Sequence, residues 1–584
     1  MQWVSSCCKE KEADDLVEVT SGSLWNSEEK QVSNWGGNVS FRCKVLHPRS
    51  EAELREILDY HHDCNIRVGG TLHSFNTSCS TDGLLLRLDR FRTLQLEPDG
   101  SSVRIGAGLV LREVERFLSS SALTLPVPLS TTTQNVIGAM CHATRGAGGY
   151  CLASYCIELK LTSREGGENA TTKTLRGEDL QYAACSLGVL GVVSEVVLTT
   201  VQAYNLSETI SFADDFSRAM QIMLASPRTY VFIWPYVWQY MIAQRDEVAC
   251  DEPVTRSSLK DAVTDLVSIA TVDLLAELDN LSGTSLKILG HAYNAIRSIT
   301  PDQAKQVGRS VDIVDQKFVN FMPGNLQFEV LMPSSKVGDA VEILKLVVEV
   351  FAGTQEYIDR SQPWAARLQD YGLWEGVMSY FGTGVLNVLT YLRLTREDRF
   401  CIMSPTYKGS KVCIDSPIDD NSAWYCGFNV EYYTPTDPER FHTLGGVLLP
   451  LLLEFCDGRL HWGKYFPLDD ALLCRNLDAH PGAEKFLEVR SRFDPECQFL
   501  NEHYAKSLGL EAQKSEDPFR STSSFTSSMS VSKKYTLAIT HVESRYSIGL
   551  PFSPIVTTPE SVTRVQSERS YFFDMTKTKE TNKV

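Results

Sequence analysis

The chain has 584 residues, of which 43% are hydrophobic and 22% are charged, values typical of a globular protein with several domains. Its formal net charge is -17, and so acidic a surface repels phosphate backbones, which argues against nucleic acid as a partner. The 16 cysteines include no Cys-x-x-Cys pair, so they indicate buried thiols in a reducing compartment, and we expect an intracellular, cytoplasmic protein.

The two ends of the sequence differ from its middle. Residues 1–33 are polar and acidic and lack the apolar core of a signal peptide, so they predict a poorly ordered arm. Residues after about 510 are rich in Ser, Thr and Lys and predict a mostly disordered tail, with one marginal strand near 535–541. No transmembrane segment is expected, because the longest apolar run, 446–454, suits a buried helix. Acylation of Cys7 and Cys8 would still allow peripheral membrane association.

The first ordered stretch alternates strand and helix signals. A strand near Val45 precedes a helix in which Ser50 and Glu53 are spaced as a capping box, with an apolar face formed by Leu54, Ile57 and Leu58. Further strands are predicted over 66–68, 84–88 and 102–107, and an amphipathic helix over 111–118.

The strand at 66–68 runs into Gly69-Gly-Thr-Leu-His-Ser-Phe-Asn76. Two glycines let the backbone approach a ligand without Cβ atoms in the way, and His73 and Ser74 follow where the strand ends. Taken alone, this pattern equally fits a tight turn with a hydrogen-bonded histidine.

Residues 125–149 combine small residues, hydroxyls and glycines with almost no charge. Such a stretch is costly to order as a plain loop, whereas its N–H groups and hydroxyls suit a groove for a polyphosphate or a polar ring. A strand is predicted over 157–161, and a glycine-rich turn leads into a buried strand that ends at 198.

From residue 204 the pattern changes to that of a substrate-covering domain. The elements expected there are an aromatic-rich segment at 231–240, helices over 256–300 and 337–351, and strands over 326–333 and 385–394, the last carrying Arg393. The segment Gly458-Arg-Leu-His-Trp-Gly-Lys464 follows, then a short helix over 486–492 and a closing stretch over 493–501.

Three of these stretches together, 71–76, 125–149 and 458–464, resemble the covalent-flavin oxidoreductases of the vanillyl-alcohol-oxidase superfamily. Within it the chain is most similar to the sugar-lactone and alditol oxidases, which include gulono- and arabinono-lactone oxidases. Thr71–Asn76 stands where that family has Gly-His-Ser, and His461-Trp-Gly-Lys464 matches its C-terminal signature. The resemblance covers about residues 34–505, including Phe493-Asp-Pro and Phe499-Leu-Asn501.

The resemblance implies an α+β fold with a PCMH-type FAD-binding domain of two α+β subdomains and an α+β cap domain. The corresponding boundaries are 1–33 for the arm, 34–204 for the FAD-binding domain, 205–455 for the cap, 456–508 for a segment returning to the flavin, and 509–584 for the tail.

The same resemblance implies FAD joined to the protein through the ring of His73. The residues that match flavin-contacting positions are Gly69, Gly70, Thr71, Leu72, Ser74, Phe75, Leu129, Ser130, Thr131, Gly138, Cys141, His142, Ala143, Thr144, Gly146, Gly191, Val192 and Val193. Among them, the loop at 191–193 matches one that meets the flavin's pyrimidine edge. For the small residues in this set, a plain tight turn is the alternative.

The family chemistry is oxidation of a CH–OH carbon of a sugar-derived lactone or polyol by hydride transfer to flavin N5. Oxygen, giving peroxide, or another electron acceptor then takes the electrons. A cation near the reduced flavin stabilises the transition state, which makes Lys464 the first candidate and Arg393 the second. A solvated turn lysine and a strand-edge salt bridge are the respective alternatives. His461 either orients the substrate or packs under the turn.

Three departures from the family bear on substrate and mechanism. Leu72 replaces a glycine before the histidine, so it can crowd the flavin and weakens the case for a covalent bond. Tyr391 stands where the family has a glutamate two residues before the arginine, and tyrosine is no carboxylate base at neutral pH. Glu329 is a substitute for that carboxylate, or else an exposed strand residue, which we favour. Leu129 replaces a glycine or alanine and predicts slow reaction with oxygen.

Two rival functions stay open. One is oxidation of a different alcohol on the same scaffold, because Tyr391 and Leu129 depart from the family pattern. The other is a flavin-binding protein that has lost turnover and acts as an interaction module through its tail.

Overall fold

The computed structural model describes residues 28–249, 252–255, 297, 304–315, 325–354, 363–384, 386, 388–409, 423–433 and 438–510. Several expectations lie outside these residues: the arm up to residue 27 with Cys7 and Cys8, almost all of the helical stretch 256–300, and the tail with its marginal strand.

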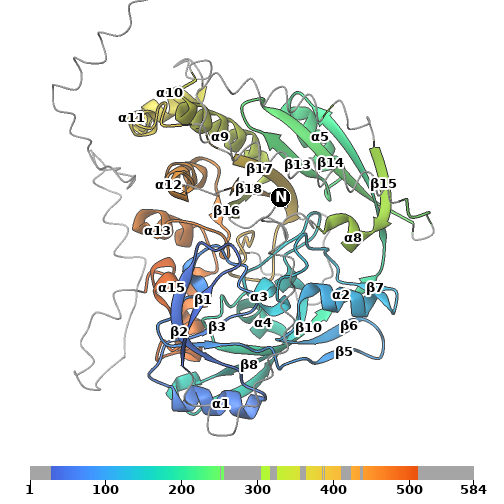
Figure 1. The fold of residues 1–584 in the computed structure, drawn as a ribbon, viewed down its shortest axis with the longest axis vertical. Helices are drawn as coiled ribbons and strands as arrows, with labels where there is room; N and C mark the ends of the chain where they lie inside the picture. Colours follow the sequence, from blue (N-terminus) through green and yellow to red (C-terminus); the bar gives the residue numbers. More distant parts are fainter. Residues whose placement is uncertain are drawn as a thin grey trace, which may run out of the picture. The chain divides into compact units, whose positions relative to one another are not determined.

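The N-terminal region begins with a four-stranded sheet that contains the predicted turn. Its strand order is β1-β2-β4-β3, with parallel pairing of β4 to both β2 and β3. The strands β1, β2 and β3 are labelled in Figure 1. The bounds are Glu29–Ser33 (β1), Ser40–Leu46 (β2), Ile66–Val68 (β3) and Leu84–Leu86 (β4). Because Glu29–Ser33 pairs with β2, the expectation that the polar arm extends to residue 33 is wrong.

Helix α1 (Glu51–Tyr60) links β2 to β3 and buries the predicted apolar face. The side chain of Ser50 accepts a hydrogen bond from the Glu53 N–H, as expected for an N-cap. The carboxylate of Glu53, however, accepts from the Arg49 N–H and not from the capping residue, so the reciprocal half of the predicted capping box is wrong.

A second, five-stranded antiparallel sheet completes the N-terminal region, in the order β5-β6-β10-β8-β9. Its strands are Leu94–Leu96 (β5), Ser102–Gly106 (β6), Cys156–Ser163 (β8), Thr171–Leu175 (β9) and Val192–Thr199 (β10). Helices α2 (Leu111–Ser119), α3 (Val136–Cys141) and α4 (Leu180–Ala183) accompany it, and β7 (Leu123–Thr124) pairs with β11 (Val201–Gln202). The buried strand predicted after the glycine-rich turn at 187–191 is confirmed as β10.

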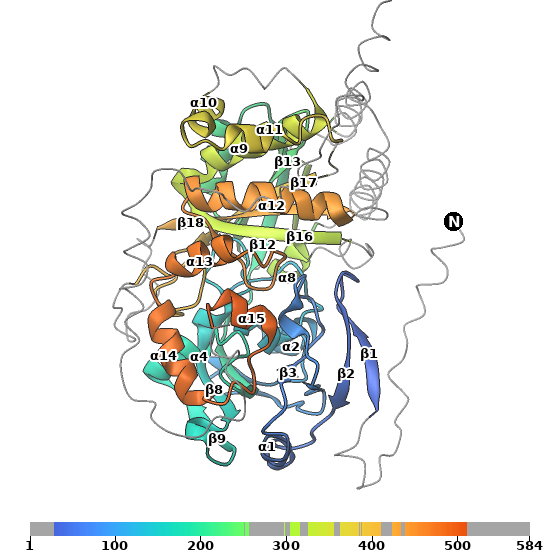
Figure 2. The ribbon, with the colours of Figure 1, turned by 90° about the vertical axis from the view of Figure 1, so that its left-hand side faces the viewer.

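The cap is an eight-stranded antiparallel sheet, ordered β15-β12-β14-β13-β17-β18-β16-β19. Its strands are Asn205–Ala213 (β12), Tyr230–Trp234 (β13), Gln239–Val248 (β14), Ala304–Arg309 (β15), Asn325–Pro333 (β16), Val388–Arg396 (β17), Trp424–Tyr433 (β18) and Arg459–Leu460 (β19). Its helices are α5 (Phe216–Ala225), α8 (Ser310–Val314), α9 (Val337–Ala352), α10 (Pro363–Asp370), α11 (Trp374–Met378) and α12 (Pro438–Phe455). Helix α12, which runs along β16 in Figure 2, confirms the buried helix predicted at 446–454.

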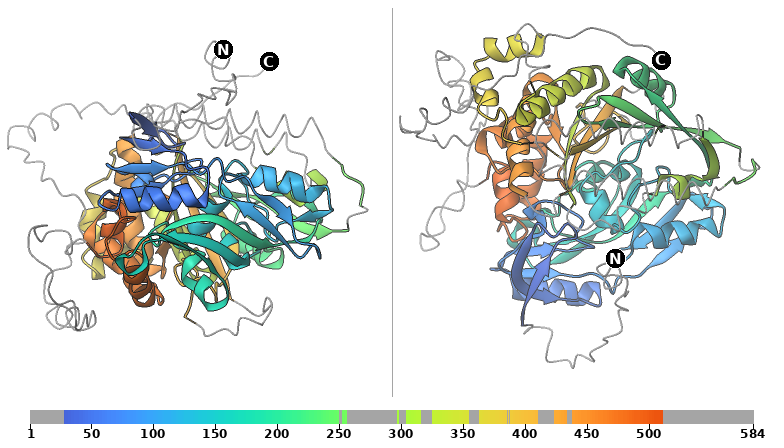
Figure 3. Two further views of the ribbon diagram at one scale, coloured as in Figure 1. Left: turned by 90° about the horizontal axis from the view of Figure 1, so that it is seen from below. Right: turned by 45° about the horizontal axis from the view of Figure 1, so that its top comes forward.

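The C-terminal segment returns to the N-terminal region and completes its core. The helices are α13 (Asp470–Asp478), α14 (Ala483–Phe493) and α15 (Glu502–Ser507), which form an orange group next to the blue elements of the N-terminal region in Figure 3. Helix α13 contacts both α12 of the cap and α15. The side chains of Phe486, Phe499 and Tyr504 are buried in the same hydrophobic core as Leu54. A hydrogen bond also links this segment to β3, because the Ile66 N–H donates to the Gln498 carbonyl at 2.7 Å. The α+β fold predicted from the resemblance is thereby confirmed. Across the described ranges, no helix combines the length and apolar character that crossing a bilayer requires.

Candidate active site

Two segments that are almost 400 positions apart in the sequence are joined by hydrogen bonds at the centre of the site. The Phe75 N–H donates to the Gly463 carbonyl at 2.9 Å. The Asn76 side-chain amide donates to the carbonyls of Trp462, at 2.8 Å, and Lys464, at 2.7 Å. The Lys464 ammonium lies 4.8 Å from the centre of the Phe75 ring. The turn at 69–76 and the segment at 461–464 therefore meet, and His73 and Lys464 line one cavity.

His73 is held as a neutral imidazole. Its ring stacks on Trp35 with centroids 5.1 Å apart, and its Nε2 lies 3.1 Å from the Thr133 hydroxyl. Burial, and then the charge of Lys464, lowers the pKa of His73 to about 4. The preceding Leu72 has a φ of 57°, in the left-handed region that glycine adopts without strain, and its carbonyl accepts from the Trp35 N–H. The chain thus keeps a glycine-type turn with a leucine in it.

The cavity between the two segments opens to solvent, and together with its open mouth it encloses about 1040 Å³. Fifteen of the residues predicted from the resemblance line it: Gly70, Thr71, Leu72, His73, Ser74, Leu129, Ser130, Thr131, Gly138, His142, Thr144, Tyr391, Arg393, His461 and Lys464. The N-terminal region and the cap both contribute, since β17 carries Tyr391 and Arg393.

A second cavity, of about 790 Å³, continues from the first. The two share Arg67, Val68, Gly70, Thr71, Asn135, Gly138 and His142, and the predicted residues Gly69, Cys141, Gly191 and Val193 line only the second. Four other predicted residues are not among the described residues that line either cavity: Phe75, Ala143, Gly146 and Val192. Whether they contact a cofactor, and whether the 191–193 loop meets a flavin's pyrimidine edge, stay predictions.

Gly191 has a structural reason to be glycine. Its φ is 144°, and a Cβ there would lie 2.6 Å from the Thr162 carbonyl oxygen on β8. The backbone can follow this path into β10 only without a side chain.

Glu329 lies buried beneath the cavity, so the expectation that it is an exposed strand residue is wrong. It is 1% exposed, and the Arg393 Nη2 donates to both of its carboxylate oxygens, at 3.0 and 3.2 Å. Burial alone would raise the pKa of Glu329, but the charges of Arg393, His461, Arg145 and Lys464 together lower it to about 2. Because β17 lies between β13 and β18, this pair is an interior ion pair and not a strand-edge one.

The middle strand β18 makes this pairing possible. Glu329 on β16 and Arg393 on β17 lie on either side of β18, opposite Asn429 and Gly427 respectively. A Cβ at Gly427 would come within 2.6 Å of a Glu329 oxygen and 3.4 Å of the Arg393 side chain. The absent side chain leaves room for the carboxylate and the guanidinium to meet across the strand.

His461 supports the turn that presents Lys464. Its Nδ1 accepts a hydrogen bond from the Gly463 N–H at 3.1 Å, which leaves its Nε2 3.9 Å from a Glu329 oxygen. Burial lowers the pKa of His461 to about 3, so the ring is neutral. These contacts are those of packing under the turn, and a direct role toward a substrate stays a prediction.

Lys464 and Tyr391 present polar groups to the cavity. The Lys464 ammonium donates to the side-chain oxygen of Gln327, and burial lowers its pKa to about 8 despite the nearby carboxylates of Glu329 and Glu431. Tyr391 is buried with its ring 5.9 Å from those of Tyr230 and Phe232, and burial raises its pKa well above 10. Tyr391 is therefore a neutral hydrogen-bonding group, as expected from its chemistry.

The sequence-based reasoning missed Arg145 and Gln327, which also line the first cavity. Arg145 is fully buried, and its Nε and Nη2 donate to the Ala143 carbonyl at 3.1 and 2.9 Å. Its Nη1 has no hydrogen-bond acceptor in the described part of the chain. A signal existed in the sequence, because Arg145 is the one charged residue in the stretch 125–149.

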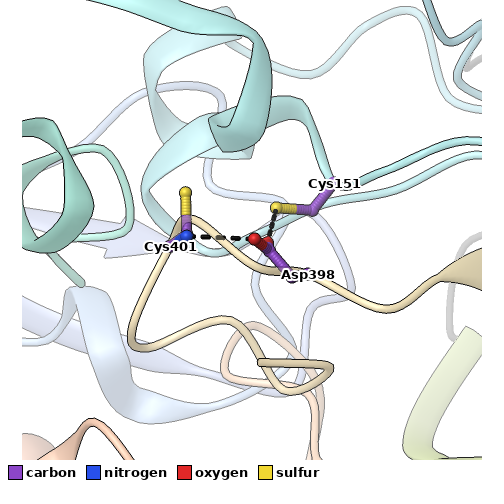
Figure 4. A group of neighbouring side chains, drawn as sticks. All are labelled: Cys151, Asp398 and Cys401. Carbon is purple, nitrogen blue, oxygen red and sulfur yellow. Dashed lines mark hydrogen bonds between the residues drawn. The ribbon is translucent and has the colours of Figure 1, made fainter. Parts of the chain in front are cut away.

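Near Arg145, the side chains of Cys151, Asp398 and Cys401 gather within 4.8 Å of one another (Figure 4). One Asp398 oxygen accepts from the N–H groups of Phe400 and Cys401, and the other accepts from Ser154 and Cys151. Because both oxygens already have donors, the contacts are those of a structural link between the 398–401 loop and the N-terminal region. All twelve cysteines in the described ranges are free thiols, and nine of them are buried.

Comparison with known proteins agrees with this geometry. Residues 44–170 match the family described as FAD binding domain, and residues 391–508 match the family described as D-arabinono-1,4-lactone oxidase. These two matches contain the 69–76 turn, the 125–149 stretch, the Tyr391–Arg393 strand and the Lys464 segment. The chain is a distant homologue of the gulonolactone, arabinonolactone and alditol oxidases. It is an FAD-linked oxidoreductase acting on CH–OH groups.

Full-length relatives have different activities. A long-chain alcohol oxidase from an uncultured marine euryarchaeote is 23% identical over 508 residues, which are 84% of this chain and 99% of that protein. An L-gulono-1,4-lactone dehydrogenase of Mycobacterium tuberculosis (strain ATCC 25618 / H37Rv) is 24% identical over 492 residues, 82% of this chain and 99% of that protein. The crystal structure of a cholesterol oxidase from B. sterolicum matches with a TM-score of 0.58 at 13% identity, covering 83% of this chain and 97% of that one. This likeness shows a shared fold, that of the vanillyl-alcohol-oxidase type.

Proposed function

We propose that this flavoenzyme oxidises a CH–OH carbon of a sugar-derived lactone or polyol, with FAD held covalently through His73. The observation that carries the proposal is the single cavity in which the neutral His73, Lys464 and Arg393 meet, with walls from both the N-terminal region and the cap. Chains that share sequence with this one include an L-gulono-1,4-lactone dehydrogenase and an alditol oxidase, which supports this substrate class.

The residues of the two connected cavities suit an extended dinucleotide. Small residues and hydroxyls from 69–71 and 130–138 line the walls, where their N–H and O–H groups can donate to phosphates and ring edges. Arg87 lines the second cavity beside Asp89 and offers positive charge to a pyrophosphate, whereas the Arg67 guanidinium donates to backbone carbonyls of the protein, including that of Gly188. When bound, FAD would supply the hydride-accepting centre of the reaction.

His73 is prepared for attachment by its protonation state. With a pKa of about 4, the imidazole is uncharged at neutral pH, so a ring nitrogen lone pair is available to form a bond. Nε2 lies 3.1 Å from the Thr133 hydroxyl, within hydrogen-bonding distance, so this nitrogen is already engaged. We therefore assign Nδ1 as the attachment atom.

The cap residues orient the alcohol. Arg393 is fixed by Glu329, Tyr391 can donate to or accept from a hydroxyl, and Gln327 presents its amide beside Lys464. The ammonium of Lys464 places a positive charge in the cavity, which would stabilise the negative charge that a bound flavin gains on accepting the hydride. The catalytic role of Lys464 is thus electrostatic.

Leu129 lines the same cavity and is 6% exposed. We infer that its side chain slows the approach of oxygen to the reduced cofactor, so that another acceptor reoxidises the enzyme in preference. The Leu129→Gly variant should then be reoxidised by air roughly tenfold faster or more, while the rate of anaerobic reduction by substrate is unchanged. Rapid reoxidation of the unmodified enzyme with stoichiometric peroxide contradicts this inference.

The substrate class is tested by anaerobic mixing of the purified yellow protein with aldonolactones, alditols and a long-chain primary alcohol. Bleaching of the flavin by a lactone or an alditol is the expected result. Bleaching by the long-chain alcohol alone would instead indicate a long-chain alcohol oxidase, like the euryarchaeal relative. No bleaching by any of them would favour a flavin-binding protein without turnover.

A further inference from the structure

The wall of the first cavity carries positive charge and no carboxylate. Arg145, Arg393 and Lys464 line it, and no Asp or Glu occurs among its described lining residues. The three histidines of the wall, His73, His142 and His461, are neutral because burial lowers their pKa values to between about 3 and about 4. This is a local reversal of sign in a chain whose formal net charge is -17.

Only one of these three cations forms a direct ion pair with a carboxylate of the described chain. Glu329 forms its ion pair with Arg393. Within the described ranges, no carboxylate oxygen lies within 4 Å of the Arg145 guanidinium or the Lys464 ammonium. Arg145 donates to the Ala143 carbonyl, and Lys464 donates to the neutral side chain of Gln327. Glu431 acts on Lys464, and Asp398 on Arg145, only at longer range, so a closer negative charge from a bound molecule would further stabilise either cation.

Two guanidinium nitrogens without hydrogen-bond acceptors indicate where a bound anion would lie. Arg145 Nη1 and Arg393 Nε are both buried and both lack a hydrogen-bond acceptor in the described part of the chain. The two guanidinium groups belong to the wall of the same cavity. Planar guanidinium N–H groups match the geometry of a carboxylate, to which charge-assisted hydrogen bonds are about twice as strong as neutral ones.

We propose that the substrate is a hydroxy-carboxylate whose carboxylate is bound at Arg145 and Arg393, next to the carbinol that is oxidised. This inference rests on the proposed function for the oxidation of a CH–OH carbon by the bound flavin, and it replaces the neutral lactones and polyols of that proposal with anionic hydroxy acids as the preferred substrates. Lys464 then balances the negative charge of the reduced cofactor, and Arg145 balances the substrate. Arg145 acts as a specificity-determining residue.

The test compares anaerobic flavin reduction by matched compounds: glycerate and gluconate, each against its amide and against glycerol or sorbitol. For each carboxylate, the rate constant of flavin reduction divided by the Kd should be roughly tenfold to a hundredfold higher than for its amide. This is the range expected for a hydrogen bond to a charged group. Arg145→Gln should remove this preference, and Arg145→Lys should retain part of it. Arg116→Gln, which removes a charge from the exposed face of α2, should leave it unchanged.

A second measurement needs no variant. Butanoate, which has no hydroxyl to oxidise, should perturb the flavin absorbance of the unmodified holoenzyme and compete with substrate, whereas butanamide should do neither at the same concentration. This result holds even if the Arg145 variants fail to fold or to retain flavin.

The outcomes separate this inference from the proposed function. Reduction by lactones, amides or alditols as fast as by carboxylates overturns the inference and leaves the proposed function standing. Arg145→Gln lowering all rates equally, or shifting the flavin's reduction potential with the carboxylate-to-amide ratio unchanged, also overturns it. Failure of every CH–OH compound to reduce the flavin overturns both.

Discussion

The charge on Lys464 sets the alkaline limit of activity. If its ammonium stabilises the developing negative charge, Lys464→Met should lower the rate of flavin reduction by about 100- to 1000-fold, the loss seen when one preorganised donor is removed from an active site. The pKa of Lys464 is lowered to about 8 by burial, so the ammonium is about nine-tenths present at pH 7 and about one-tenth present at pH 9. The reduction rate should therefore fall roughly tenfold between these two pH values.

Stopped-flow reduction under anaerobic conditions measures this directly. Lys464→Arg keeps a positive charge throughout this range, so its pH profile should lose the alkaline decline even if its rate at pH 7 is lower. A decline near pH 8 that persists in Lys464→Arg, or a wild-type rate in Lys464→Met, would refute the assignment.

The stability of the wild-type protein relative to Lys464→Met should rise with pH, whereas the wild-type rate of flavin reduction should fall. The folded-state pKa of Lys464 lies below the unfolded value, so the penalty of burying the ammonium is present below pH 8. It is relieved as the pH rises from about 8 toward about 10.4, the unperturbed lysine value. The difference in unfolding free energy between wild type and Lys464→Met should move in favour of wild type across that window, while wild-type activity falls. A difference independent of pH would contradict the lowered pKa.

Three further changes test the geometry around Lys464. Glu329→Gln breaks a buried ion pair and should reduce the free energy of unfolding by about 3–5 kcal/mol in denaturant titrations near neutral pH. Because the pKa of Glu329 is lowered to about 2, the stabilisation by the ion pair should disappear as the pH falls from about 4 toward 2. A loss of stability that is independent of pH would contradict the lowered pKa. Gly427→Ala should lower the free energy of unfolding by about 1–3 kcal/mol through overpacking, and it should slow flavin reduction. The control Gly446→Ala, whose new methyl group meets open space on α12, should leave stability unchanged or slightly increased. Equal effects of the two variants would refute the role given to β18. Asn76→Ala removes two buried donors to the 462–464 carbonyls and should lower the reduction rate more than it lowers flavin content, and an unchanged rate would show that the Lys464 segment holds its place without them.

Local patterns in the sequence were sufficient to predict the elements that frame the site. The apolar runs at 66–68 and 192–198 are strands, and the face of Leu54, Ile57 and Leu58 is buried as its spacing predicts. These predictions need only neighbouring residues, because the periodicity of apolar side chains is a local property of a helix or strand. The approach of the 69–76 turn to Lys464 needed more, since it came from the family resemblance and not from spacing.

The contacts across the cap sheet could not be predicted in this way. Glu329 looked like an outward-facing strand residue because its partner, Arg393, is 64 residues away and is reached only across β18. The meeting of the two depends on strand order, on register and on the missing side chain of Gly427. None of these is visible in the local pattern around residue 329.

Arg145 shows a different limit. A single charge in a glycine-rich stretch was visible in the sequence, but its meaning depends on burial and on which donors lack acceptors. Leu72 is similar, because the sequence shows a departure from glycine and only the backbone shows that a left-handed turn is kept regardless.

The most direct test of the account is where the flavin goes when the protein is precipitated with acid. We expect the yellow chromophore to stay in the pellet and to be carried by a proteolytic peptide that contains His73. In the His73→Ala variant, we expect it to be released into the supernatant. A chromophore that leaves the unmodified protein on precipitation, or that is attached to a peptide without His73, would contradict a flavin bonded to this histidine in the cavity it shares with Lys464.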